Sequence, residues 1–146
     1  YEPDMTVAQL DPLFDQLEGV LTPLIKKLGD QPAVSLPAGP YPKAAQMSFS
    51  HKMLDTMGFD TDTGRLDESV HPFTCGMTPT DVRLTTRIDE ADPLSCLFSV
   101  LHEGGHGLYE QGQHPDLWGR GLFGGSSLGI HESQSRLWEN LVGRSL

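Results

Sequence analysis

The chain has 146 residues, a formal net charge of −10 and a hydrophobic content of 37%. This length and composition are typical of one ordinary domain with its own hydrophobic core, which we expect to span residues 1–146. The negative charge argues against nucleic acid or an anionic membrane as a partner. No apolar stretch approaches the roughly 20 residues that a membrane-spanning helix needs.

Both ends of the chain look cut, since it opens with Tyr1 rather than methionine and closes soon after a helical pattern. We therefore expect an excised piece of a larger protein. No signal peptide is visible. Cys75 and Cys96 lack Cys-x-x-Cys partners, so we interpret them as thiols of a reducing compartment and predict a cytoplasmic location.

The first third of the chain predicts two helices. Apolar residues at steps of three and four predict a helix that Thr6 caps and Gly29 ends. A proline-rich connection over residues 30–42 follows. A second helix is expected from Lys43 to Met57, with Gly58 as its stop.

The middle of the chain has strand character over residues 64–70, 73–77 and 81–88. In the last segment apolar residues alternate with polar ones, so one face of the strand is apolar. The polar face carries Asp81, Arg83 and Thr85. Two interpretations of Arg83 stay open on the pattern alone: a solvated outer face, or the edge of a cleft that presents Arg83 to a substrate.

The third predicted helix carries the chemistry. Asp92 followed by Pro93 is a typical helix start, and an apolar stripe at helical spacing follows it. His102-Glu103-Gly104-Gly105-His106 then places two imidazoles one helical turn apart on the same face. Two imidazoles so placed can bind one metal ion, with Glu103 positioned to act on water. The pattern is typical of a zinc-dependent peptidase.

The pair Gly104-Gly105 is costly in a helix, by about 2 kcal/mol relative to two alanines. A helix tolerates this most readily where another backbone or a substrate must come close. We therefore expect such an approach beside the two histidines.

A catalytic zinc ion needs a third protein ligand. Candidate side chains downstream of His106 are Glu110, His114, Asp116, His131, Glu132 and Glu139. Glu110 lies off the bonding face, and His114 comes too late after His106 for the three-histidine pattern. Glu132 lies on a separate predicted helix that begins near Ser127, after a glycine-rich loop over residues 113–126. A carboxylate from a second element suits the site, so Glu132 is the predicted ligand.

Four motifs of this chain resemble, in order and spacing, those of the carboxypeptidase Taq family of metallocarboxypeptidases. They are His71-Pro72-Phe73, Asp81-Val82-Arg83-Leu84-Thr85, His102-Glu103-Gly104-Gly105-His106 and His131-Glu132-Ser133-Gln134. The resemblance implies a mainly helical α+β fold, with a small antiparallel sheet beside the active-site helix of a zincin-like catalytic core. It also implies a homodimer.

Carried over residue by residue, the resemblance implies that His102, His106 and Glu132 bind one divalent metal ion. Zinc fits these ligands best, and cobalt or manganese would also fit. Glu103 would be the general base. Residues expected to bind the substrate or to support the site are His71, Asp81, Arg83, Thr85 and His131.

Family members are much longer than this chain and carry further motifs, an Ile-Arg-x-x-Ala-Asp type and a Gln-Asp-x-His-Trp type, that are absent here. We therefore expect the metal-binding core of a larger enzyme. It would release C-terminal residues from peptides, with metal-activated water and Glu103 as base. Two alternatives stay open: a metal-binding fragment without activity, and a zincin endopeptidase or aminopeptidase.

Overall fold

The computed structural model describes residues 2–32 and 35–145. The chain divides into two compact units, Tyr1–Ala38 and Gly39–Leu146. The prediction of one domain over residues 1–146 stays a prediction. None of the described helices is long and apolar enough to cross a membrane.

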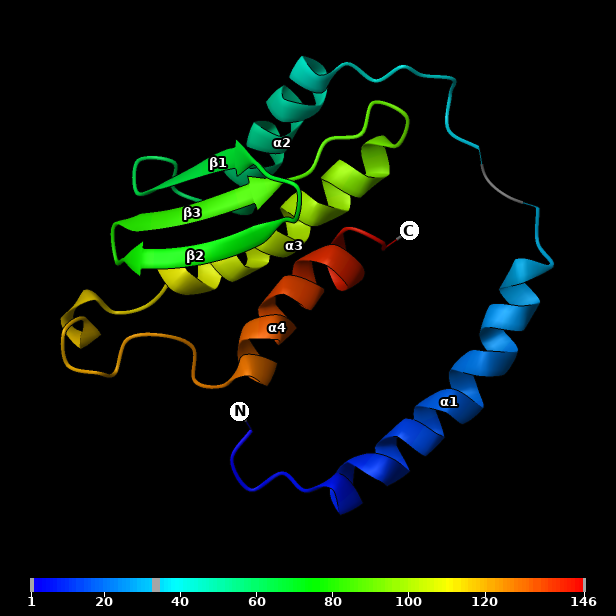
Figure 1. The fold of residues 1–146 in the computed structure, drawn as a ribbon, viewed down its shortest axis with the longest axis horizontal. Coiled ribbons are helices and arrows are strands. Elements are labelled where there is room, and N and C mark those ends of the chain that lie inside the picture. The colour runs from blue at the N-terminus through cyan, green and yellow to red at the C-terminus, as the bar shows by residue number, and fades with distance from the viewer. Residues whose placement is uncertain (1, 33–34, 146) are drawn as a thin grey trace. The chain divides into compact units, whose positions relative to one another are not determined.

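The first unit contains one helix, α1 (Val7–Gly29) (Figure 1). Thr6 is its N-cap residue, and the Thr6 backbone N–H donates to Oε1 of Gln9 at 2.8 Å. Lys26 and Lys27 occupy the last turn, where their charge suits the helix dipole. The predicted helix is confirmed. It buries none of its side chains, so its apolar stripe is exposed.

The second unit packs helices against a three-stranded sheet (Figure 1). Its helices are α2 (Lys43–Met57), α3 (Pro93–Gln111) and α4 (Leu128–Arg136), with a short helix η1 (Pro115–Leu117) and a π-helical segment η2 (Leu137–Val142). Its strands are β1 (Gly64–Glu68), β2 (Phe73–Thr78) and β3 (Asp81–Thr86). The apolar core joins α2, the sheet and α3, and its buried members are Leu54, Phe59, Leu66, Val82, Leu84, Cys96 and Val100.

The mainly helical fold with a small sheet is confirmed, but the sheet is mixed rather than purely antiparallel. Its strand order is β1-β3-β2. β2 and β3 form an antiparallel hairpin across a short turn, whereas β1 runs parallel to β3 with Gly64 opposite Val82. The reason is that β3 inserts between the two earlier strands, so β1 and β2 pair with β3 and not with each other. The strands β1 and β3 also end two residues earlier than predicted, at Glu68 and Thr86.

The start of α3 follows the sequence prediction. Asp92 is the N-cap, and its carboxylate accepts hydrogen bonds from the backbone N–H groups of Leu94 and Ser95 at 3.1 and 3.4 Å. Pro93 is the first helical residue. Cys96 and Val100 of α3 are buried in the apolar core. This packing fixes the rotation of α3 and therefore the direction in which its histidines point.

Candidate metal centre

α3 and α4 bring together the three residues that were predicted as metal ligands. His102 and His106 lie on successive turns of α3, with ring centroids 5.0 Å apart. Glu132 of α4 places its Oε2 atom 3.3 Å from Nε2 of His106 and 3.8 Å from Nε2 of His102. One ligand atom from each residue lies within 4.8 Å of the other two. Two imidazole nitrogens and a carboxylate oxygen are a donor set typical of catalytic zinc.

Gly104 and Gly105 of α3 explain how the neighbouring elements come so close to this helix. A Cβ atom on Gly105 would stand 2.6 Å from the carbonyl oxygen of Gln134 and 2.7 Å from Cα of Ser135, both in α4. A Cβ atom on Gly104 would meet the side chains of Met57 and Leu54 on α2 at 2.7 and 2.9 Å. The predicted close approach of another backbone is therefore found at Gly105, while Gly104 admits apolar side chains.

Glu103 is buried and turns towards the sheet. Its side chain is held by the hydroxyl of Thr74 on β2, which lies 2.6 Å from Oε2 and also 3.0 Å from the Glu103 carbonyl oxygen. Burial raises the pKa of Glu103 above its usual range, and the Thr74 hydrogen bond offsets part of this rise. A carboxylate with a raised pKa beside a metal-ligand cluster is typical of a general base.

The local environment also perturbs the pKa values of two of the candidate ligands. Burial lowers the pKa of His106, and the neighbouring His131 and His102 lower it further. The neutral imidazole that a metal needs is therefore favoured. Burial alone would raise the pKa of Glu132, but the hydrogen bond from Arg136 and the adjacent His102 outweigh this and lower it. Arg136 Nε lies 2.8 Å from Oε1 of Glu132.

An open cleft of about 620 Å³ lies beside the cluster. Its lining includes His102, Glu103, His71 and Pro72. His71 therefore lies beside the cleft, and its contact with a substrate stays a prediction. Its Nδ1 atom lies 2.7 Å from the carbonyl oxygen of Pro72.

The strand motif that was expected to line the cleft has a different position. Val82 and Leu84 of β3 are fully buried on the side of α3, so Arg83 between them projects from the opposite face of the sheet. There it forms a two-point ion pair with Asp81, at 2.9 and 2.7 Å. Thr85 accepts a hydrogen bond from the backbone N–H of Phe73. This geometry favours a role in holding the sheet together, and contact with a substrate stays a prediction.

His131 contacts the cluster directly, as a supporting residue. Its Nδ1 atom lies 2.6 Å from Nδ1 of His106, and its Nε2 atom lies 2.7 Å from Oε1 of Glu110. On the other side, Nδ1 of His102 lies 2.9 Å from Oε2 of Glu139. In the sequence Glu110 and Glu139 were candidates only as metal ligands, so these contacts were missed. The spacing of His106 and Glu110 puts both on one side of α3, but it does not show that His131 of the neighbouring helix contacts both of them.

Comparison with known proteins gives a consistent result over the whole chain. The family model described as carboxypeptidase Taq (M32) metallopeptidase matches residues 1–146. The chain is 46% identical to thermostable carboxypeptidase 1 of Thermus thermophilus over 149 residues, which cover 100% of this chain and 29% of that protein. It is 44% identical to carboxypeptidase 1 of Bacillus subtilis, covering 99% of this chain and 30% of the relative. The chain thus spans about 30% of the length of these curated relatives.

Solved structures agree with the fold. The crystal structure of an M32 carboxypeptidase from Deinococcus radiodurans matches with a TM-score of 0.93 at 42% identity, over 99% of this chain and 29% of that one. Metallocarboxypeptidase 1 of Trypanosoma cruzi matches with a TM-score of 0.87 at 38% identity, over 99% of this chain and 31% of that one. The fold that holds α3 and α4 therefore occurs in solved carboxypeptidase structures.

Proposed function

This chain belongs to the carboxypeptidase Taq (M32) metallopeptidase family, and from that premise we propose that it is the metal-binding core of an enzyme that releases C-terminal residues from peptides. The observation that carries the proposal is the convergence of His102, His106 and Glu132 beside a cleft that Glu103 also lines. One divalent ion would be held by these three residues. Zinc suits the two nitrogens and one oxygen best, and cobalt or manganese are the alternatives.

A divalent ion bound there would supply Lewis acidity and lower the pKa of water towards neutrality. The chain's own residues then have separate roles. Glu103 takes a proton from the water that attacks the scissile carbonyl, and it returns that proton to the leaving amine. Thr74 fixes the Glu103 carboxylate from β2, so that the base has one preferred orientation. His71 and Pro72 also line the cleft and would contact the peptide.

The proposed substrates are peptides with a free C-terminus, because the relatives carry the name carboxypeptidase. Arg83 was expected to bind the substrate or to support the site, yet it projects away from α3. The cleft itself is lined by Arg136 and Arg144, and both pair with Glu139. A homodimer in the cytoplasm remains part of the proposal. The unpaired thiols of Cys75 and Cys96 agree with a reducing compartment.

Metal content and hydrolysis, measured on the same preparation, test the proposal. The substrate is an N-terminally blocked dipeptide, and its C-terminal amide is the control. About one metal ion per chain with hydrolysis of the free acid alone would support the proposal. Metal with no hydrolysis would favour a binding fragment without activity, and equal hydrolysis of the amide would favour an endopeptidase. No metal would overturn the site.

A further inference from the structure

We propose that two carboxylates, Glu139 and Glu110, hold the imidazoles of His102 and His106 in the tautomer that leaves both Nε2 atoms free for a metal ion. The proposal rests on the proposed metal centre, and it assigns positioning roles that the ligand motifs do not contain. Glu139 contacts His102 directly, whereas Glu110 acts on His106 through His131.

The His102 side is a direct contact. Nδ1 of His102 lies 2.9 Å from Oε2 of Glu139. An ionised carboxylate can only accept hydrogen bonds, so the hydrogen of a neutral His102 must sit on Nδ1. The lone pair is then on Nε2, which is the nitrogen that faces Glu132 at 3.8 Å. Glu139 thus selects the ligating nitrogen.

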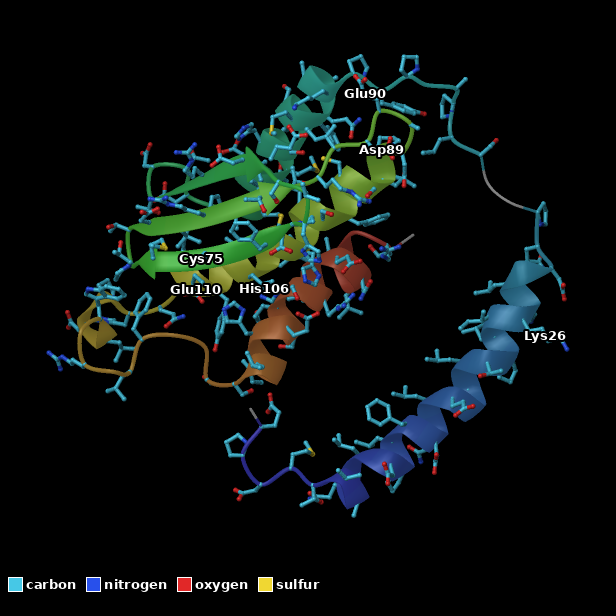
Figure 2. The ribbon with its side chains drawn as sticks, viewed as in Figure 1. Lys26, Cys75, Asp89, Glu90, His106 and Glu110 are labelled. Atoms are coloured by element: carbon cyan, nitrogen blue, oxygen red, sulfur yellow. The ribbon has the colours of Figure 1, made fainter. Side chains whose placement is uncertain are left out.

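The His106 side passes through a second imidazole. Oε1 of Glu110 lies 2.7 Å from Nε2 of His131, so it accepts the hydrogen on that atom. A neutral His131 then has a lone pair on Nδ1, which lies 2.6 Å from Nδ1 of His106. His106 must therefore donate from Nδ1, and its Nε2 is left free towards Glu132 at 3.3 Å. Figure 2 shows His106 and Glu110 near each other along α3.

Both carboxylates are fixed in their own right. The Glu139 side chain is only 12% exposed, and it accepts hydrogen bonds from Arg136 at 3.1 Å and from Arg144 at 2.8 Å. Two guanidinium groups therefore donate to this carboxylate, one to each oxygen, which favours its role as an acceptor. Its place in a π-helical segment also fits, since such segments are frequent at functional sites.

Glu110 is also shielded from solvent and hydrogen-bonded. Its side chain is 13% exposed, and its Oε2 accepts a hydrogen bond from Gln113 at 3.3 Å. The same oxygen lies over Gly76 of β2, where a Cβ atom would come within 2.5 Å of it. A carboxylate with so little exposure is usually paired, because removing its charge from water costs free energy. By contrast, the Asp81–Arg83 pair on the outer face is exposed and needs no such role.

Arg136 connects this arrangement to the third ligand. Its Nε donates to Glu132 at 2.8 Å and its Nη1 to Glu139 at 3.1 Å. One guanidinium therefore sets the distance between a ligand and the carboxylate that orients another ligand. Such outer partners typically change metal affinity by about 10- to 100-fold when they are removed.

The tautomers give the most direct test, and they need no metal. Long-range ¹H–¹⁵N spectra of the ¹⁵N-labelled, metal-free chain, recorded where the imidazoles are neutral, report which ring nitrogen carries hydrogen. We expect both His102 and His106 to carry it on Nδ1. Glu139→Ala should let the hydrogen of His102 move between its ring nitrogens, while His106 and His131 keep their tautomers. Glu110→Ala should have this effect on His131 and His106 and leave His102 unchanged. Each variant is thus the matched control of the other.

Metal affinity gives the second readout, by competition with a chromophoric chelator for Zn²⁺. Glu139→Ala and Glu110→Ala should each weaken binding by about 10- to 100-fold. Glu139→Gln and Glu110→Gln keep an acceptor oxygen and should recover part of the loss. Glu18→Ala on exposed α1 removes the same charge and should change nothing.

The experiments separate a failure of the orienting role of Glu139 and Glu110 from a failure of the proposed metal centre. Unchanged tautomers and unchanged affinity in both alanine variants would overturn the inference. Equal loss in the alanine and glutamine variants, with tautomers intact, would also overturn it, because it would indicate a general loss of packing. If the unaltered chain binds no Zn²⁺, the proposed function fails, and the tautomers alone decide the orienting role of the two carboxylates.

Discussion

The Cα atom of Ser135 lies 2.7 Å from the point that a Cβ atom on Gly105 would occupy. α3 and α4 therefore meet backbone to backbone at this position. Gly105 falls between His102 and His106 in α3, and Ser135 follows Glu132 by three residues in α4. Any side chain at position 105 would separate the two halves of the candidate metal centre.

The first prediction concerns Gly105→Ala. The added methyl group should force α4 away from α3, because backbone atoms cannot move aside as a flexible side chain can. We expect a loss of about 1–3 kcal/mol in the free energy of unfolding. The affinity for Zn²⁺ should fall as Glu132 moves from the histidines. Urea unfolding and chelator competition measure the two effects.

Gly19→Ala on α1 is the matched control, because no atom lies within 4 Å of the added Cβ position. It should favour α1 by up to about 1 kcal/mol through helix propensity. It should also leave Zn²⁺ affinity unchanged. Unaltered stability and affinity in Gly105→Ala would show that α4 can shift freely, and would contradict the prediction.

Gly76→Ala gives a second prediction, on the strand side of the site. The new Cβ atom would stand 2.5 Å from Oε2 of Glu110, so the carboxylate must move away from His131. Alanine is less costly than glycine in a strand, so the free energy of unfolding should change by less than about 1 kcal/mol. Zn²⁺ affinity should fall although stability holds. A variant with both quantities unchanged would show that Glu110 keeps its contact.

The sequence predicted the local parts of this site well. Asp92 and Pro93 mark the start of α3 because a cap and a first-turn proline act on adjacent residues. The spacing of His102 and His106 places them on one face for the same local reason. These two features depend on periodicity and local capping, which a single sequence displays. Glu132 was chosen because a carboxylate from a second element suited the site, and its Oε2 atom lies 3.3 Å from Nε2 of His106.

The remaining features depend on contacts between distant segments. Strand alternation identified the apolar face of β3 but not its neighbours, so the parallel pairing of β1 was missed. The same alternation left Arg83 open between a cleft and an outer face, and only the position of α3 favours the outer face. Glu139 reaches His102 because α3 and α4 cross at Gly105. A crossing geometry of this kind leaves no periodic pattern in the sequence.

Glu103→Gln tests whether Glu103 acts as the general base without taking part in metal binding. The amide keeps the size of the side chain and can still contact Thr74, but it cannot take a proton from water. Hydrolysis of the blocked dipeptide should disappear, while Zn²⁺ affinity should stay within about threefold of the unaltered chain, a difference of less than about 1 kcal/mol. His106→Ala is the contrasting control and should lose the metal. Loss of metal in Glu103→Gln as well would show a structural role for Glu103.

Thr74→Val removes the hydroxyl that contacts Glu103 and keeps the shape of the side chain. Burial raises the pKa of Glu103 in the metal-free chain, and the Thr74 hydrogen bond opposes that rise. The pKa of Glu103 should therefore be higher in the variant than in the unaltered chain. A ¹³C titration of the Glu103 carboxyl in both metal-free proteins measures the difference.

The sign of the accompanying stability change follows from the direction of this shift. A carboxyl whose pKa is raised on folding binds its proton more tightly in the folded chain than in the unfolded chain. The contribution of Glu103 to the free energy of unfolding is full at a pH below its pKa in the unfolded chain, which is near 4.5. This contribution is lost as the pH rises through the pKa of Glu103 in the folded chain. Thr74→Val should extend this decline of the unfolding free energy to higher pH. Identical titration curves in the two proteins would show that the hydroxyl does not act on the Glu103 carboxylate.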